Sequence, residues 1–394
     1  MSLRGILATG AALYSPVWKR GWADNLGILV TDRSVVETAL EKCRTLEYFM
    51  DGKTLAQQEF FFNRLQKNYR RLKKRARKRN FDSFRVYDRD IPEIPLALDV
   101  YHIQSVSPEY AGTDAGADAV LYVMMYLYER PYYKDPGEEE MWLTHMKDAA
   151  ARALDIPRGR VIVSVRKRQR GANQYVKSDG IAVAGVIQEN DMKFHIMLGS
   201  YIDTGIFLDH RILRGMAREA ASGKRVLNLF CYTGAFSVAA ALGGAALVDS
   251  VDISNTYLET ARRNFSLNGL LSSPEYSFIR SDVREFLERS VSQNRVWDII
   301  ILDPPAFSNS KKTRGTFDIN RDWAVLVNLC LNALDAGGAL FFSVHSGRFR
   351  FDRNAIAEKT KRGYTAGFAD ITALTTSEDF SRRTGRGVWK FSVT

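Results

Sequence analysis

The chain has 394 residues, 45% of them hydrophobic, and a formal net charge of +11 at pH 7. This length exceeds one ordinary core and predicts two or three domains, and the hydrophobic content excludes a disordered chain. No apolar run approaches the roughly 20 residues that span a bilayer, and the opening segment lacks the length and flanks of a signal peptide. We therefore expect a cytoplasmic protein with no membrane partner.

Cysteine usage is sparse. Cys43, Cys231 and Cys330 lie far apart and form no CxxC pair or Cys/His cluster. This usage is typical of a reducing compartment and predicts no metal site.

We assign no role to the N-terminal segment, residues 1–55, and predict the first helix with a chemical signature from Gln57 to Asn80. Its apolar positions at helical spacing form a predicted core stripe: Phe61, Leu65, Tyr69 and Leu72. Nine of the thirteen residues from Lys67 to Arg79 are basic, and almost no acid offsets them. Such a face binds phosphates, although a merely solvated helix face is the alternative. The candidate RNA contacts are Arg70, Lys73, Lys74 and Arg77.

Residues 56–200 are predicted to form a mixed α/β RNA-binding domain that includes this basic helix. We expect strands at Phe84–Tyr87, Ala97–Ile103, Arg160–Val165 and Ile181–Gln188, and a helix at Glu138–Leu154. A basic hairpin loop joins the last two strands and carries Arg166, Arg168, Arg170 and Gln174. Basic residues interleaved with an amide and an aromatic can hold RNA backbone and stack bases, while a charged solubilising hairpin fits equally well.

From Arg225 onward, strands and helices alternate. Strands are expected at Arg225–Phe230, Leu247–Asp252, Tyr276–Asp282, Trp297–Asp303, Ala339–Val344, Gly367–Leu374 and Gly387–Val393. Helices are expected at Ala235–Leu242, Thr256–Leu267, Val283–Ser290 and Arg321–Leu334. This rhythm specifies βαβ units and a doubly wound sheet, in which the final strand is an antiparallel partner because no helix precedes it.

The fourth of these strands predicts the mouth of an active site. The apolar run Ile299 to Leu302 is continuous, as expected for a central strand covered on both faces. Asp303 then falls at the carboxyl end, the edge where open α/β sheets bind ligands. The residues that follow it, Pro304, Pro305, Phe307 and Asn309, would form a stiff loop suited to a flat, polar substrate such as a base.

The three preceding strand ends predict a nucleoside cofactor. Gly234 permits close backbone approach at a helix start, and Asp252 follows 18 residues later, at the distance of an acid that receives a ribose. Asp282 is placed to accept from an adenine amino group, with Val283 covering the ring. Each acid alone can be a helix cap, but their order favours a cofactor. A single glycine in the first turn fits S-adenosylmethionine better than a dinucleotide.

Longer motifs carry a family resemblance. The segments DTGIFLDHR (Asp203 to Arg211), LNLFCYTGAFSV, SVDISNTYLETARRNFSLNGL and ILDPPAFSNSKK resemble class I methyltransferases of bacterial large-subunit rRNA. Most similar is the C-terminal, guanine-N7 half of the K/L family, from near Glu59 to the C-terminus. Fused members of that family carry an N2-guanine methyltransferase half before this region, for which 394 residues leave no room.

The resemblance implies a Rossmann-like, seven-stranded methyltransferase domain at residues 201–394, acting on 23S rRNA or a large-subunit precursor. It also implies a cofactor pocket formed by Phe207, Asp209, Arg211, Tyr232, Gly234, Asp252, Ser254, Asp282 and Val283.

Residue types separate the possible methyl acceptors. Methylation of cytosine C5 needs a cysteine nucleophile, and His345 stands where related enzymes place that thiol. Enzymes that methylate exocyclic amines usually bind the amine with a motif in which an aromatic residue directly follows the two prolines. In this chain Ala306 intervenes before Phe307. Guanine N7 needs no general base, so positioning suffices.

We therefore predict an N7 acceptor on an unpaired or flipped guanine, with Asp303 positioning it and Lys311 and Lys312 contacting phosphates. The alternatives are an exocyclic amine, cytosine C5, or a non-catalytic RNA-binding or assembly protein.

Overall fold

The computed structural model describes residues 33–106, 119–130, 132–166, 182–200, 203–271, 273–308, 316–381 and 385–394. Only the backbone is described for 33–51, 105–106 and 165–166. The chain divides into two compact parts, Met1–Gln58 and Glu59–Thr394. A boundary near residue 200 within the second part stays a prediction. None of the described helices is long and apolar enough to cross a membrane.

The basic helix α3 (Arg33–Lys78) begins well before the predicted start at Gln57. The predicted core stripe is confirmed: Phe61, Leu65, Tyr69 and Leu72 are all buried. The helix ends before Asn80, which adopts a left-handed conformation at φ 52°, a common way to terminate a helix. One face of α3 is therefore buried in the core, and the basic residues lie on the remaining surface of the helix.

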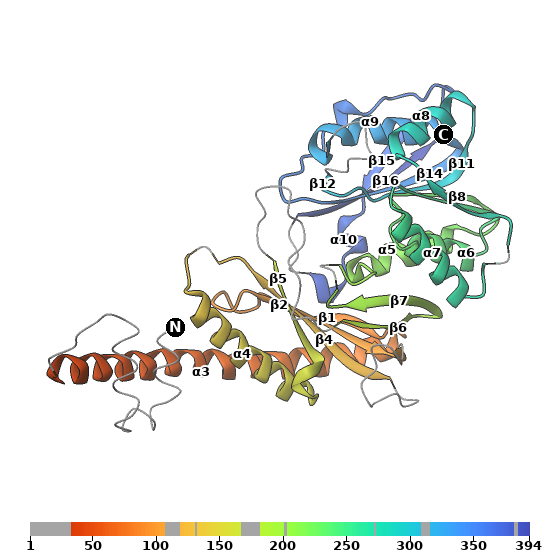
Figure 1. Ribbon diagram of the computed structural model, residues 1–394. Coiled ribbons are helices and arrows are strands. Elements are labelled where there is room, and N and C mark those ends of the chain that lie inside the picture. Colours follow the sequence, from red (N-terminus) through yellow and green to blue (C-terminus); the bar gives the residue numbers. More distant parts are fainter. Residues whose placement is uncertain are drawn as a thin grey trace. The chain divides into compact units, whose positions relative to one another are not determined.

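A four-stranded sheet packs against α3, in the order β1 (Ser83–Asp88), β2 (Leu96–Ile103), β4 (Val120–Tyr128) and β5 (Val161–Arg166). Three of these strands match predicted ones, whereas β4 was not foreseen. Helix α4 (Pro136–Leu154) covers the same face as α3, with Trp142 and Met146 buried beside Phe61 and Leu65. Figure 1 shows both helices beside this sheet.

A smaller sheet, β3 (Ser105–Val106), β6 (Val183–Glu189) and β7 (Met192–Leu198), joins the two halves of this part of the chain. Strand β7 was not predicted. Its Phe194 and Ile196 share one buried cluster with Tyr101 of β2 and Phe265 further along the chain. The four-stranded sheet and the seven-stranded C-terminal sheet, which follows in the chain, thus share a continuous core.

The C-terminal sheet has seven strands, in the order β10-β9-β8-β11-β14-β16-β15. Their bounds are β8 (Arg225–Leu229), β9 (Leu247–Asp252), β10 (Tyr276–Arg280), β11 (Trp297–Leu302), β14 (Leu334–His345), β15 (Ala366–Asp370) and β16 (Arg386–Val393). Neighbours from β10 to β14 are parallel, and β16 is antiparallel to both β14 and β15. The predicted Rossmann-like, doubly wound α/β fold and its antiparallel last strand are confirmed.

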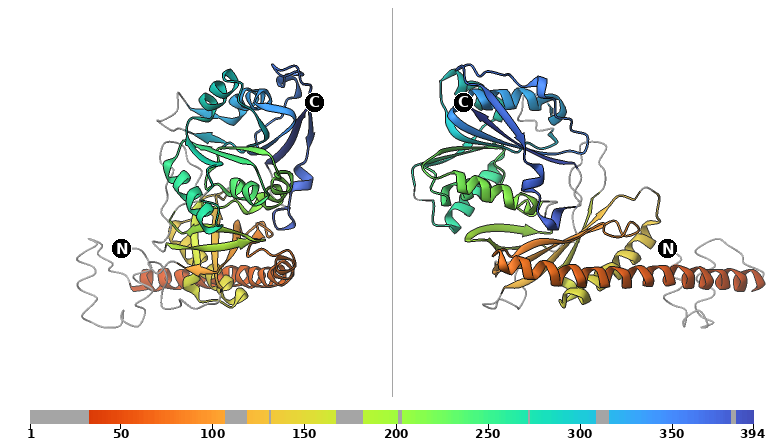
Figure 2. Two further views of the ribbon diagram at one scale, coloured as in Figure 1. Left: turned by 90° about the vertical axis from the view of Figure 1, so that its right-hand side faces the viewer. Right: turned by 180° about the vertical axis from the view of Figure 1, so that it is seen from behind.

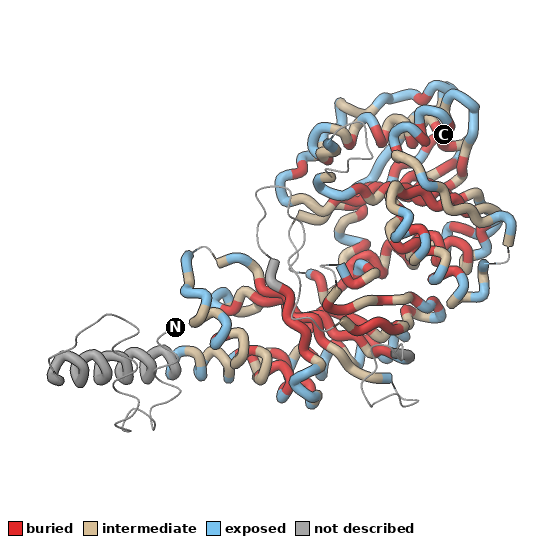
Figure 3. The backbone as a smooth tube through the Cα atoms, in the orientation of Figure 1, coloured by how far each residue is buried: buried red, intermediate tan, exposed pale blue. Residues whose placement is uncertain are grey.

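Helices cover both faces of this sheet (Figure 2). One face holds α5 (Arg211–Ala220), α6 (Ala235–Leu242) and α7 (Asn255–Leu267), and the other holds α8 (Val283–Ser292) and α9 (Ile319–Asn332). Along β11, Ile299 and Ile301 enter the core of the first face, while Ile300 and Leu302 enter that of the second. This two-sided burial explains why the apolar run is continuous. Figure 3 shows that the centre of this part of the chain is buried.

Strand order reverses between β8 and β11. The chain runs from β8 through β9 to β10 in one direction, and from β11 to β14 in the other. The carboxyl ends of β8 and β11 therefore border the crevice where doubly wound sheets hold ligands.

Candidate active site

The loop after β8 has an unusual backbone. Phe230, Tyr232 and Gly234 all lie in the left-handed region, with φ of 53°, 50° and 73°. Residues with a Cβ atom are disfavoured there, and such conformations cluster at functional sites. A Cβ added to Gly234 would lie 2.8 Å from the Cβ of Ala261, so only glycine lets the start of α6 pack this closely on α7.

Hydrogen bonds from three directions hold this loop. The Tyr232 amide donates to Asp252 Oδ2 at 3.0 Å, and the Ser254 amide donates to Asp252 Oδ1 at 2.9 Å. The Gly205 amide donates to the Tyr232 hydroxyl at 3.1 Å, while the Thr233 hydroxyl donates to the Gly205 carbonyl at 2.7 Å. Burial raises the pKa of Asp252 above its usual range, against the opposing effect of the amide donors. Asp252 is thus a buried carboxylate that ties two loops together.

Two predicted cofactor residues also cap helices. Ser254 accepts from the Tyr257 amide at the start of α7, and Asp282 Oδ1 accepts from the Arg284 and Glu285 amides at 2.9 and 3.1 Å at the start of α8. Val283 is buried. Because β9 and β10 are adjacent and parallel, Asp252 and Asp282 follow one another along the same sheet edge.

An aromatic group lines the opposite side of the crevice. The ring of Phe207 is 37% exposed and lies 5.4 Å from that of Tyr232 and 6.3 Å from the imidazole of His345. The interplanar angle with His345 is 22°, so these two rings are nearly parallel. The segment that precedes α5 therefore closes the crevice with a partly exposed aromatic face.

Asp303 lies at the centre of a polar cluster. Its Oδ2 is 3.3 Å from Nε2 of His210, and its Oδ1 accepts from the hydroxyl of Ser343 and lies 4.0 Å from Nε2 of His345. The two Nε2 atoms are themselves 2.7 Å apart. Asp303 follows β11, His345 ends the neighbouring β14, and His210 comes from the short helix η3 (Leu208–His210).

The environment of Asp303 keeps it ionised. Burial alone would raise the pKa of Asp303, but the charge and hydrogen bond of His210, then the charge of His345 and the Ser343 hydroxyl, outweigh it and lower the pKa to about 2. At neutral pH this group is an acceptor and a fixed negative charge.

Asp209 and Arg386 complete the cluster on its inner side. Oδ2 of Asp209 lies 3.7 Å from Nδ1 of His345 and 3.8 Å from Nε of Arg386. Asp209, His210 and His345 are close enough to suggest a cation. However, the two Nε2 atoms share a hydrogen bond and a guanidinium faces the carboxylate, so the donor set matches a hydrogen-bonded network better than a metal centre.

The two prolines lead into a short hairpin. Pro304 is buried and Pro305 is exposed, after which β12 (Phe307–Ser308) pairs with β13 (Phe317–Asp318). The Phe307 ring is 48% exposed. It projects from a paired backbone, as a stacking residue requires. Asn309, Lys311 and Lys312 lie outside the described residues.

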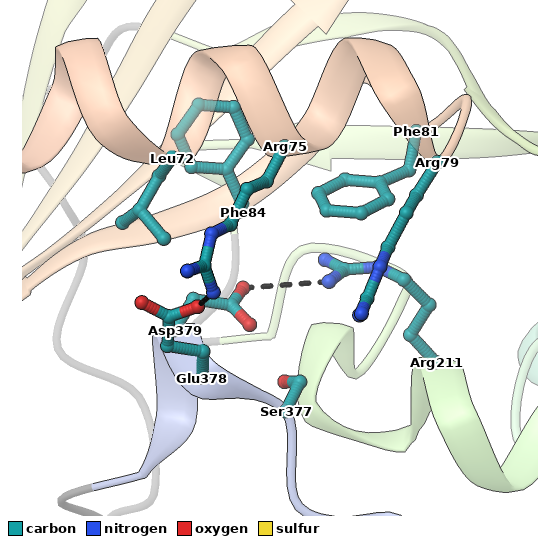
Figure 4. Close-up of a pocket in the computed structure, with 9 residues that line it drawn as sticks. All are labelled: Leu72, Arg75, Arg79, Phe81, Phe84, Arg211, Ser377, Glu378 and Asp379. Atoms are coloured by element: carbon teal, nitrogen blue, oxygen red, sulfur yellow. Dashed lines mark hydrogen bonds and ion pairs between the residues drawn. The ribbon is translucent and has the colours of Figure 1, made fainter.

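Arg211 is not brought together with the other predicted cofactor residues. Its guanidinium lies 3.7 Å from the centre of the Phe81 ring, donates to the Ser83 carbonyl at 2.6 Å, and reaches Asp379 at 3.4 Å. It lines a small pocket between the end of α3 and the helix η5 (Glu378–Phe380), where Figure 4 shows it pointing toward Asp379. Arg211 thus connects α5 to β1 of the four-stranded sheet and to η5.

The basic face of α3 is divided in two. Arg70, Lys74 and Arg77 are exposed, and the Lys73 ammonium lies 5.1 Å from the centre of the Tyr69 ring. Arg71 and Arg75 instead form ion pairs with Glu378. The Arg166 side chain and residues Arg168, Arg170 and Gln174 lie outside the described part of the chain.

Three members of the Asp303 cluster were not foreseen as site residues: His210, Ser343 and Arg386. His345 was singled out only because it stands where related enzymes place a thiol. Two features of the chain could have indicated His210 and His345. His210 belongs to the DTGIFLDHR motif, and His345 ends a strand that is adjacent to β11 and parallel to it.

Comparison with known proteins is consistent with this geometry. A family model described as S-adenosylmethionine-dependent methyltransferase matches residues 116–366. Ribosomal RNA large subunit methyltransferase K of Neisseria meningitidis serogroup B is 37% identical over 334 residues, which cover 84% of this chain and 86% of that protein. The K/L protein of Methylococcus capsulatus is 38% identical over 83% of this chain. The chain spans only 41% of that longer relative.

Solved structures agree on the fold. A protein described as a SAM-dependent methyltransferase from Streptococcus mutans matches with a TM-score of 0.63 at 21% identity. The match covers 85% of this chain and 81% of that one. A second crystal structure with the same score is a complex with SAH.

Proposed function

Because this chain belongs to the ribosomal RNA large subunit methyltransferase K/L family of S-adenosylmethionine-dependent methyltransferases, we propose that it methylates guanine N7 in 23S rRNA. The observation that carries the choice of N7 is the set of contacts around Asp303, whose two oxygens face the Ser343 hydroxyl and Nε2 of His210. These contacts hold the pKa of Asp303 at about 2, which makes this carboxylate a poor proton acceptor at neutral pH. An acceptor with a free lone pair and no proton to lose suits such a site.

The crevice residues fit S-adenosylmethionine, which supplies an activated methyl group. The loop from Phe230 to Gly234, with its left-handed backbone, follows β8 and borders the crevice at the carboxyl end of that strand. Each oxygen of Asp252 accepts one amide, and a carboxylate offers about four lone-pair sites, so the ribose hydroxyls can still be received. Tyr232, Ser254, Asp282 and Val283 would complete the pocket, with Phe207 and Asp209 on the facing side. We leave Arg211 out of this set because its guanidinium contacts Phe81, Ser83 and Asp379.

An exocyclic amine fits the site less well. Its nitrogen must lose a proton on methylation, and Asp303 is too acidic to take that proton readily. Asp303 is better suited to accept hydrogen bonds from N1 or N2 of a guanine. The exposed ring of Phe307 would stack on the base.

Cytosine C5 is disfavoured by the state of the described thiols. Burial raises the pKa of Cys231 well above its usual range, with the charge of Asp252 adding to the shift, and burial also raises the pKa of Cys330. C5 chemistry needs a thiolate, and neither sulfur ionises readily.

The N7 edge of a paired guanine faces a deep, narrow groove that side chains cannot enter. The target guanine must therefore be unpaired or flipped out, with flanking phosphates held by basic residues such as the exposed face of α3. An enzyme that methylates bacterial ribosomal RNA would meet its substrate in the cytoplasm.

Chemical cleavage of the product tests this proposal. Purified protein, labelled S-adenosylmethionine and rRNA from a strain lacking the enzyme are expected to yield RNA that aniline cleaves at one methylated guanine after borohydride reduction. Label recovered in another nucleoside, without cleavage, contradicts the N7 assignment. Cofactor binding without transfer to any RNA would instead support the assembly-protein alternative.

Charge reversal on α3 tests RNA binding separately. Changing Arg70, Lys74 and Arg77 to glutamate is expected to weaken RNA binding at least about 10-fold near 0.1 M salt and to flatten its salt dependence. The matched control reverses the exposed Arg289, Lys359 and Lys361 elsewhere on the C-terminal domain. Cofactor affinity should be unchanged in both triple variants. Unaltered RNA affinity in the α3 variant would mean that this face is only solvated.

A further inference from the structure

We propose that His210 is a positioning residue that donates its Nε2 proton to Asp303 and thereby restricts the site to acceptors with no proton to lose. His345 is its partner in a hydrogen-bonded pair of imidazoles. The proposal rests on the proposed function and deepens it, because it identifies what makes Asp303 a permanent carboxylate.

A hydrogen bond joins the rings of His210 and His345. Their Nε2 atoms are 2.7 Å apart, so one of them must carry a hydrogen and the other a lone pair. If His345 were the donor, neutral His210 would carry its proton on Nδ1. If His210 is the donor, neutral His345 carries its proton on Nδ1.

Two carboxylates decide between these arrangements: Oδ2 of Asp303 lies 3.3 Å from Nε2 of His210, and Asp209 lies on the Nδ1 side of His345. His210 is fully buried, and its Nδ1 has no hydrogen-bond partner among the described residues. A proton there would be a buried, unsatisfied donor, which is costly. Nδ1 of His345 instead faces the carboxylate of Asp209 at 3.7 Å. The favoured state therefore has the proton of His210 on Nε2 and that of His345 on Nδ1.

In this state, the Nε2 proton of His210 lies between Nε2 of His345 and Oδ2 of Asp303, the latter at 3.3 Å. Ser343 donates to the other oxygen of Asp303. Both carboxylate oxygens thus accept from buried donors that would have to be given up for Asp303 to bind a proton.

Two further charged side chains, Asp209 and Arg386, lie near this pair. Asp209 on η3 faces Nδ1 of His345, and Arg386 at the start of β16 faces Asp209. The aromatic rings of Phe207 and Phe236 contact His210 edge-on at 6.2 and 5.5 Å. Of these groups, only His210 has an N–H donor within hydrogen-bonding distance of the Asp303 carboxylate.

The chemical consequence is selectivity between acceptors. When a ring nitrogen such as N7 attacks, it gains the methyl group and one positive charge, and no proton leaves. A permanent carboxylate nearby stabilises that charge. An amine would need the same carboxylate to accept a proton, which the His210 and Ser343 hydrogen bonds oppose.

The tautomers can be tested without measuring the activity of any variant. The chain has five histidines, so ¹⁵N-histidine labelling of the full-length protein resolves each ring by NMR. Single substitutions assign the signals. We expect the Nε2–H tautomer for His210 and the Nδ1–H tautomer for His345. The Nδ1–H tautomer of His210 would overturn the proposal.

A pH profile tests the consequence for Asp303. A carboxylate that works only when ionised loses activity as pH falls through its pKa, so removing a donor moves that loss to higher pH. His210→Leu is expected to raise the midpoint of the acidic loss of single-turnover methyl transfer by about one pH unit or more, whereas His210→Gln, which retains an N–H at this position, should restore the wild-type midpoint. Ser343→Ala removes the other donor and should shift the midpoint in the same direction.

His145→Leu is the matched control, because His145 is a half-buried histidine on α4. An unchanged midpoint in His210→Leu would contradict the proposal whatever Ser343→Ala shows, and so would equal shifts in His210→Leu and His210→Gln. These outcomes are independent of the product assay: RNA methylated elsewhere than N7 refutes the proposed acceptor, while the midpoints still report whether His210 controls Asp303.

Discussion

Replacing Asp303 with alanine is expected to slow methyl transfer to rRNA at least about 10³-fold while leaving cofactor binding and the fold intact. In the proposed function this carboxylate contacts the guanine and stabilises the charge of the methylated base, so its loss would remove both effects. The measurement is single-turnover transfer with labelled S-adenosylmethionine, alongside cofactor affinity by calorimetry.

Two companion variants make this result specific. Asp303→Asn keeps the size of the side chain but not its charge, and should be nearly as slow as the alanine variant. Asp370 provides the matched control, since it is an exposed aspartate that also ends a strand of the same sheet, at the far edge on β15. Asp370→Ala should retain wild-type rates. Full activity of Asp303→Ala would remove this residue from the site.

Replacing Arg214 with alanine is expected to lower the free energy of unfolding by about 3–5 kcal/mol. Arg214 and Glu189 are both almost fully buried, and their two hydrogen bonds, at 2.9 and 2.6 Å, connect α5 to the end of β6. Without the guanidinium, the Glu189 carboxylate stays buried without its bidentate partner. Urea denaturation followed by circular dichroism gives the change in midpoint.

The same helix supplies the control one turn later. Arg218 pairs with Asp191 at the surface, where the carboxylate is 63% exposed. Arg218→Ala should therefore cost about 1 kcal/mol or less. Replacing both buried partners, as Arg214→Met with Glu189→Leu, should recover most of the loss, because an apolar pair leaves no isolated charge. Equal destabilisation by Arg214→Ala and Arg218→Ala would contradict this account.

Periodicity along the chain predicted most of the fold because it reflects burial directly. The stripe on α3, the two-sided run of β11 and the alternation of strands and helices after Arg225 all follow from which side chains must leave water. Strands β4 and β7 were missed. In β4 (VLYVMMYLY) the apolar run has no alternation, and β7 pairs with β6 through a turn at Asn190 that we did not recognise.

Within the site, the acids at the ends of parallel strands were predictable from sequence, because such ends meet at one edge of a sheet. Asp252 and Asp303 were found in this way. What the sequence alone determined about this protein is therefore its sheet, its crevice and the family to which its motifs belong.

Only the tertiary structure decided how the side chains around that crevice pair. Contacts between residues far apart in the chain depend on helix rotation and strand register, and no local pattern encodes these. His210 reaches Asp303 across the sheet edge, whereas Arg211, the next residue, turns away to Ser83 and Asp379. Arg71 and Arg75 likewise leave the basic face of α3 to pair with Glu378. Adjacent residues thus acquired different roles because a helix directs successive side chains to different neighbours.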